Sequence, residues 1–133
     1  MNSLLCKMVR QVSIKGFEEF VKYTDKIDPQ GPPVYFYFDS KLPDGTSWCP
    51  DCVVAEPIVR AFLREVKKEL IFVHVDCGER EFYRDPQCVF RMDPRSKIRR
   101  IPTLLKWQGD RLEETELNDP DNLRRLFEVL ITP

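Results

Sequence analysis

Two cysteines separated by two residues, Cys49 and Cys52, are the side chains of this sequence best suited to chemistry. A thiolate is a nucleophile, and a thiol three residues further along a helix lies close enough to attack a sulfur bonded to the first. At the start of a helix, free backbone N–H groups and the positive helix end stabilise the first thiolate. Pro50 suits the first helical position, where its missing N–H costs little. The pattern predicts thiol–disulfide exchange, with Cys49 as nucleophile and Cys52 as resolving thiol.

The segments around the cysteine pair predict a strand before it and a helix after it. Residues 34–38 (VYFYF) have no polar face, which is typical of a central strand covered on both sides. The turn-rich residues 39–47 predict a surface loop. Residues 53–70 have helical periodicity, and Pro57 within them is expected to kink the helix. A cysteine pair in this setting is typical of a thioredoxin-like redox motif.

The rest of the chain alternates between predicted strands and helices. We expect strands at 8–14, 70–75 and 101–107, a helix from 17 to about 27, and an irregular helical connection at 79–99. A turn at 108–110 leads to a hairpin partner at 111–117, and Asp119 caps a last helix with the apolar stripe Leu123, Leu126, Phe127 and Leu130. This order predicts an α/β fold, a central mixed β-sheet flanked by helices, as one domain over residues 1–133.

Composition argues against several classes of protein. The net charge of −1 over 133 residues gives no broad field for binding nucleic acid. We find no apolar stretch of the roughly 7–15 residues of a secretory signal or the about 20 of a membrane span. The odd number of five cysteines fits poorly with a secreted disulfide framework. These features predict a cytosolic protein that binds neither membrane nor nucleic acid.

Three motifs give the sequence a resemblance to the thioredoxin superfamily. Trp48 stands directly before the cysteine pair, Pro57 lies five residues after Cys52, and residues 101–104 match an Ile/Val-Pro-Thr-Leu segment. The resemblance implies the thioredoxin fold, with Pro102 in the cis form beside the substrate. It also implies that the substrate contacts Trp48, Pro50, Asp51, Ile101 and Pro102.

The WCPDC core and the long polar loop before it are similar to a subgroup of small cytosolic thioredoxin-related proteins. The similarity extends to residues 16–20, 47–53, 55–57 and 102–106. It implies a monomer without a bound cofactor, recycled by thioredoxin reductase with electrons from NADPH. Its substrates would be cystine or selected protein disulfides, and also nitrosothiols and persulfides.

Two other functions remain open on the same resemblance. Related proteins associate with a dynein light chain, so the chain could be a binding or scaffold protein whose thiols are incidental. Alternatively, Cys49 could reduce or sense peroxide through a sulfenic acid.

Two features depart from ordinary thioredoxins. Pro50 and Asp51 replace the usual Gly-Pro, and the Asp51 carboxylate should disfavour the neighbouring thiolate and repel acidic partners. The buried aspartate of the central strand is replaced by Tyr37, while Asp39 lies two residues on. No proton acceptor for Cys52 can therefore be assigned, and we expect slow or narrow reduction of large protein disulfides.

The remaining candidate residues have plainer interpretations. A zinc site completed by Cys77 and Cys88 is disfavoured, because those cysteines are 11 residues apart and lie in different predicted elements. We expect both to pack in the core. His74 is interpreted as a strand residue with a satisfied ring. The basic run at 95–100 is a solvated connection or, because it leads into Ile101, a border of the substrate groove that attracts acidic partners.

Overall fold

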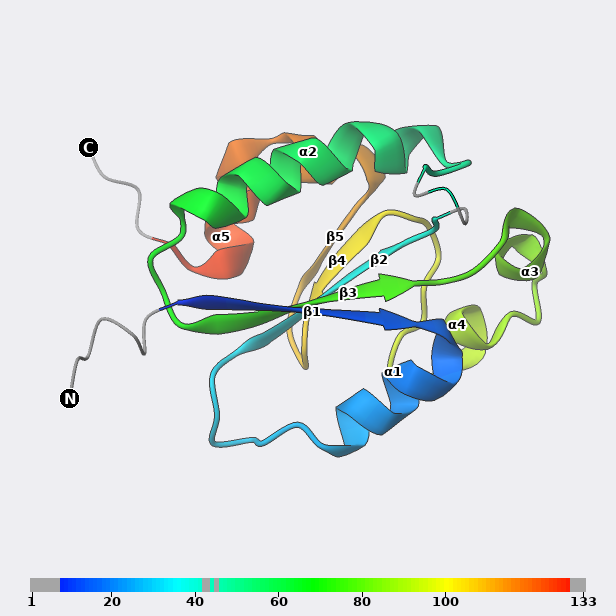
Figure 1. Cartoon of the computed structure of the whole chain (residues 1–133), viewed down its shortest axis with the longest axis horizontal. Helices are drawn as coiled ribbons and strands as arrows, with labels where there is room; N and C mark the ends of the chain where they lie inside the picture. Colours follow the sequence, from blue (N-terminus) through cyan, green and yellow to red (C-terminus); the bar gives the residue numbers. More distant parts are fainter. Residues whose placement is uncertain (1–7, 42–43, 45, 130–133) are drawn as a thin grey trace.

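The computed structural model describes residues 8–41, 44 and 46–129, and its strands form one mixed sheet in the order β1-β3-β2-β4-β5 (Figure 1). The strands are β1 (Val9–Lys15), β2 (Val34–Asp39), β3 (Leu70–Asp76), β4 (Thr103–Lys106) and β5 (Arg111–Glu113). β3 lies between β1 and β2 and pairs in parallel with both, whereas β4 is antiparallel to β2 and to β5. The sequence therefore predicted the central mixed sheet and the central position of β2 correctly.

Helices cover both faces of this sheet. α2 (Pro50–Glu65) and α5 (Pro120–Phe127) lie on one face, while α1 (Gly16–Asp25), α3 (Arg80–Arg84) and α4 (Val89–Met92) lie on the other (Figure 1). A 3₁₀ helix, η2 (Glu114–Asn118), connects β5 to α5. α5 begins as predicted, because the Asp119 carboxylate accepts the Asp121 N–H at 2.9 Å. Leu130, predicted to continue its apolar stripe, lies outside the described residues.

The alternation of β2 builds both halves of the core. Phe36 and Phe38 pack with Phe20 of α1, whereas Tyr35 and Tyr37 face the core beneath α2 and α5. All of these side chains are at most 1% exposed. Burying one large apolar side chain stabilises a fold by about 1.5–3 kcal/mol, so β2 fixes the sheet that carries the cysteine pair.

The structure corrects three boundaries. The loop predicted to start at residue 39 is not at the surface there, because Asp39 ends β2 and both Asp39 and Ser40 are 0% exposed. α2 begins at Pro50 and ends at Glu65 instead of continuing to Leu70, because Val66 takes an extended conformation and is itself buried. Pro57 lies inside α2.

The third correction concerns the hairpin partner predicted at 111–117, which is a strand only as far as Glu113. The Glu116 carboxylate accepts the Glu113 N–H at 2.8 Å, and Glu114 adopts a left-handed conformation with φ of 51°. These contacts turn the chain into η2 and bury Leu117 completely.

None of the described helices has the length and hydropathy of a membrane span.

Two tyrosines of β2 offer a matched test of this packing. The Tyr35 hydroxyl donates to the Leu126 carbonyl at 3.1 Å, whereas the buried Tyr37 hydroxyl has no hydrogen-bond partner among the described residues. We expect Tyr35→Phe to lower the free energy of unfolding by about 1–2 kcal/mol, because it removes a buried hydrogen bond to a main-chain carbonyl. Tyr37→Phe should be neutral or stabilising. Urea unfolding of both variants measures the difference, and an equal loss in both would contradict this interpretation.

Candidate functional site

Cys49 is the capping residue of α2. Its Sγ accepts the backbone N–H of Cys52 at 3.3 Å, and its carbonyl accepts the N–H of Val53 at 3.1 Å. The Cys49 N–H donates to Ser47 Oγ at 3.1 Å, which fixes the chain before the helix. Pro50 occupies the first helical position, as predicted. The sulfur therefore lies where the N–H groups and dipole of the helix stabilise negative charge.

The two thiols of the pair differ in acidity. The Cys52 thiol donates a hydrogen bond that lowers the pKa of Cys49, and the Cys52 N–H acts in the same direction. Burial and the charges of Asp51 and Asp39 oppose this effect. The pKa of Cys52 is raised by its hydrogen bond to Cys49, by burial and by the charges of Cys49 and Asp39. Cys49 is thus the sulfur that ionises first, while Cys52 keeps its proton.

Exposure at the site is lower than the sequence suggested. The surface loop predicted at 39–47 leads directly into Trp48 and Cys49, but Cys49 is only 5% exposed and Trp48 is half-buried. The Trp48 ring packs at a centroid distance of 6.1 Å from the ring of Tyr83, which anchors it against α3. Cys52 is 1% exposed. A substrate must therefore reach Cys49 through a defined opening.

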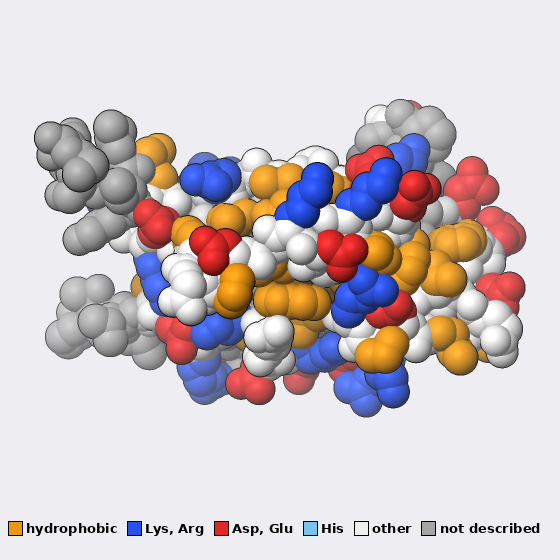
Figure 2. Space-filling view, turned by 90° about the horizontal axis from the view of Figure 1, so that it is seen from below, with side chains coloured by type: hydrophobic (Ala, Val, Ile, Leu, Met, Phe, Trp, Pro, Cys, Tyr) orange, Lys and Arg blue, Asp and Glu red, His pale blue; other side chains and the backbone are white. Residues whose placement is uncertain are grey.

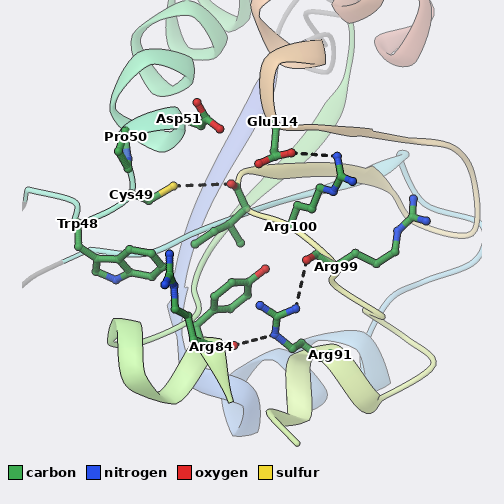
Figure 3. A pocket seen from close by; sticks show the side chains of 11 residues that line it. Trp48, Cys49, Pro50, Asp51, Arg84, Arg91, Arg99, Arg100 and Glu114 are labelled. Carbon is green, nitrogen blue, oxygen red and sulfur yellow. Dashed lines mark hydrogen bonds and ion pairs between the residues drawn. The ribbon is translucent and has the colours of Figure 1, made fainter. Parts of the chain in front are cut away.

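That opening is a cavity of about 380 Å³ at the start of α2 (Figure 3). Four residues predicted to contact substrate, Trp48, Pro50, Asp51 and Ile101, line it together with Cys49. The protonated Cys49 thiol donates to the Ile101 carbonyl at 3.6 Å, and the Ile101–Pro102 bond is cis, as the resemblance implied. Pro102 is buried behind this wall and is not among the lining residues.

Sequence reasoning missed much of the cavity wall. Tyr83 and Arg84 come from α3, Arg91 from α4, and Glu114 from η2. The basic run at 95–100 gave one indication of this wall, because Arg99 and Arg100 line the cavity. These two arginines therefore border the groove, which was one of the two interpretations of the run.

A buried polar group next to the cysteine pair was also missed. His74 Nε2 lies 2.5 Å from Asp39 Oδ1, and an Arg60 guanidinium N–H donates to His74 Nδ1 at 3.1 Å. Because a guanidinium only donates, His74 Nδ1 must accept, and Nε2 carries the proton that binds Asp39. His74 is thus a strand residue with a satisfied ring, as predicted.

The Asp39 carboxylate is only partly satisfied by this contact. Burial raises its pKa, and the hydrogen bond and charge of His74 oppose that rise. Its second oxygen, Oδ2, is buried without a hydrogen-bond partner among the described residues. The charge of Asp39 acts on both thiols of the pair, which places an acceptor with free capacity in their surroundings.

Cys77 and Cys88 are free thiols in the core, 0% and 3% exposed, which agrees with the predicted packing role. Burial raises the pKa of Cys77 well above its ordinary value, so this thiol is kept protonated. Within the described ranges, no three His, Cys, Asp or Glu residues are grouped as metal ligands.

Basic and acidic side chains are interspersed on the face that Figure 2 shows, with apolar patches between them. This face therefore has no continuous basic field of the kind that binds polyanions.

Comparisons with known proteins find close relatives over most of the chain. Residues 13–129 match the family model described as thioredoxin domain-containing protein 17-like, thioredoxin domain. The chain is 41% identical to mouse thioredoxin domain-containing protein 17 over 88% of its length and 94% of the relative's, and 37% identical to the human protein over the same shares. It is 37% identical to thioredoxin-like protein Clot of Arabidopsis thaliana, over 75% of each chain.

Solved structures agree on the fold. Thioredoxin O1 of Arabidopsis thaliana in its oxidised state superimposes with a TM-score of 0.59, at 20% identity, over 92% of this chain and 99% of that one. A Schistosoma mansoni thioredoxin gives a TM-score of 0.56 at 13% identity, over 89% and 95%. The chain therefore has the thioredoxin fold predicted from its sequence.

The acidity of Cys49 can be measured directly. Alkylation of the reduced protein by iodoacetamide should modify Cys49 first, with a pH midpoint below the value of about 8.5 for a free cysteine. Because the pKa of Cys49 is lowered, the rate of alkylation falls only when the pH drops through this lowered pKa. Asp51→Asn should lower the midpoint further, since the Asp51 charge raises the pKa of Cys49. Asp110→Asn, in the exposed turn after β4, is the control and should leave it unchanged. A midpoint above 8.5 would contradict the capping argument.

Proposed function

The chain belongs to the thioredoxin domain-containing protein 17-like family of thioredoxin domains, and from that premise we propose that it is a disulfide reductase that uses Cys49 and Cys52. The family is one of thiol–disulfide oxidoreductases. The observation that carries the proposal is the place of Cys49 at the start of α2, where its Sγ accepts the Cys52 N–H at 3.3 Å. The lowered pKa of Cys49 and the raised pKa of Cys52 agree with these roles.

The reaction follows from this division. The Cys49 thiolate attacks one sulfur of the substrate disulfide, the substrate S–S bond breaks, and the first product leaves as a thiolate. Cys52 then loses its proton and attacks Cys49, which releases the second product thiol and forms the Cys49–Cys52 disulfide. The substrate gains two electrons and the cysteine pair loses two. Thioredoxin reductase, with electrons from NADPH, is proposed to restore the dithiol, so the chain itself needs no bound cofactor.

The depth of Cys49 supports small or selected disulfides as substrates. Cys49 is only 5% exposed and lines a cavity of about 380 Å³, so its sulfur is reached by cystine or by a cysteine on an extended chain more easily than by a disulfide in a flat surface. Nitrosothiols and persulfides fit the same constraint. We propose that the protein works as a monomer in the cytosol.

Asp39 is our proposed proton acceptor for Cys52. Its unpartnered Oδ2 has free capacity, and its negative charge, which raises the pKa of Cys52, marks it as a base near that thiol. His74, held by Arg60, fixes the carboxylate through Oδ1 and leaves Oδ2 free. In this proposal Asp39 accepts the Cys52 proton in place of an aspartate at position 37, two residues earlier in β2.

A coupled assay tests the main proposal. With thioredoxin reductase, NADPH and cystine, we expect NADPH oxidation that is abolished in both Cys49→Ser and Cys52→Ser. Cys52→Ser should also accumulate a mixed disulfide on Cys49, because the second step has lost its nucleophile. Cys77→Ser, which alters a buried thiol outside the reaction, is the control and should retain activity. Undiminished oxidation without Cys49 would refute the proposal and favour a scaffold role.

Asp39→Asn separates a proton acceptor from a purely electrostatic influence. Asparagine can still accept the His74 N–H through its oxygen, but it carries no charge and is a poor base. If Asp39 accepts the Cys52 proton, the variant should slow release of the second thiol by roughly 100-fold, a typical contribution of general base catalysis, and spare the first attack. If the carboxylate acts by charge alone, its removal would lower the pKa of Cys52 and make that release faster. Rapid-mixing measurement of the two thiol releases tells these apart.

A further inference from the structure

Four arginines surround the entrance to the sulfur of Cys49. Arg84 comes from α3, Arg91 from α4, and Arg99 and Arg100 from the segment that leads into Ile101 (Figure 3). We propose that this entrance selects peptide disulfides whose cysteine is flanked by glutamate or aspartate. The inference rests on the proposed reductase function and specifies the class of disulfide that it takes.

The carboxylates nearby do not cancel this charge at the surface. Arg99 pairs with Glu113 at 2.8 Å, but the arginine side chain is 74% exposed and the glutamate only 12%. Arg100 pairs with Glu114 at 3.1 Å, with exposures of 64% and 34%. In each pair the arginine side chain is therefore more exposed than the carboxylate. A ligand that approaches the entrance meets mainly positive charge.

The other two arginines have no carboxylate within ion-pair distance in the described part of the chain. Arg91 lies over the Tyr83 ring at 4.3 Å, and its guanidinium donates to the carbonyl of Tyr83 at 2.8 Å and that of Arg99 at 3.2 Å. Arg84 is exposed at the end of α3. With Asp51 and Glu114 as the acidic lining residues, four arginines face two carboxylates around the cavity.

The arginines stand on a fixed backbone, which favours recognition over transient attraction. Ile98 is 1% exposed and its N–H donates to the Phe90 carbonyl at 2.9 Å. The Arg100 carbonyl accepts the Thr103 hydroxyl at 2.6 Å, and the Arg99 carbonyl accepts from Arg91 as described above. Because these contacts order the segment before any ligand binds, less entropy is lost when the arginines engage carboxylates.

The occupant that fits is an extended acidic segment with one cysteine. Its sulfur must reach Cys49 beside the Ile101 carbonyl, while side chains before and after it point toward the rim. Arg99 binds both oxygens of Glu113 through Nε and Nη2, and Arg100 binds Glu114 through Nη1, so flanking glutamates would be bound by the remaining guanidinium N–H groups of the two arginines. Asp51, predicted from the sequence to repel acidic partners, is outnumbered at this entrance. The chemistry remains the two-electron exchange above, and the arginines act on orientation and encounter.

Three synthetic peptide disulfides test the proposal. They share one cysteine disulfide core and differ only in flanking Glu, Gln or Lys residues, and their reduction by the dithiol protein is followed in single turnover. We expect the Glu peptide to react roughly tenfold faster than the Gln peptide at low salt, with the advantage shrinking in 0.5 M salt, where charges are screened beyond about 4 Å. The Lys peptide should be slowest.

Variants assign the preference to the entrance. Arg99→Gln/Arg100→Gln should reduce the Glu-to-Gln rate ratio toward one, whereas Arg10→Gln/Arg64→Gln, two exposed arginines outside the cavity lining, should preserve it. Glu114→Gln, which frees Arg100, should raise the ratio. A general change in the reactivity of Cys49 alters the rates of the Glu and Gln peptides equally, so it leaves their ratio unchanged.

The outcomes separate the two proposals. If no peptide is reduced above the Cys49→Ser background, the reductase function fails. If all three are reduced at equal rates, or if the double arginine variant keeps the full preference, the reductase stands and the acidic selection is overturned.

Discussion

The hydrogen bond from the Cys52 N–H to Cys49 Sγ is the contact on which the site depends. A helix cap is usually an oxygen of Ser, Thr, Asp or Asn. When the cap is a cysteine, the bond that starts α2 also stabilises the thiolate, so local folding and nucleophile activation become one interaction. Ser47 fixes the chain on one side of Cys49 and Pro50 presets the helix on the other. The pair is thus ordered for reaction before a substrate arrives.

The central strand supports this contact and carries Asp39, the carboxylate that we propose as the base. β2 is buried along its whole length, so a charged group on it can persist only if it is paired. At position 37 the side chain is a tyrosine whose burial raises its pKa, which leaves it neutral and unable to accept a proton. At the end of the strand, Asp39 has His74 as a hydrogen-bond partner on β3; the register sets His74 opposite Tyr37, and Asp39 lies two positions further along the same face of β2. The carboxylate therefore sits where β2 ends and the loop to Cys49 begins.

The sequence predicted what is local or periodic. The buried run at 34–38 and the cysteine spacing carried enough signal to indicate the strand and the helix start, while the cis bond before Pro102 was implied by the family resemblance. Contacts between segments that are distant in the sequence could not be predicted in this way. Asp39 belongs to a turn-rich stretch by composition, and only its pairing with His74, 35 residues away, explains its burial. Arg84 and Arg91 reach the cavity because two short helices pack beside it, which no spacing rule reveals.

A net charge close to zero also says little about a single cavity. The chain carries 21 basic and 22 acidic residues, and its composition alone predicts no preference for either sign of ligand. The selectivity that we propose instead follows from unequal exposure: the Arg99 side chain is 74% exposed and that of its partner Glu113 only 12%. The entrance therefore acts on an acidic ligand mainly at short range, in its encounter and its orientation, and salt weakens this attraction. For a reductase with a deeply placed sulfur, this keeps discrimination within the entrance, where the substrate cysteine must also fit.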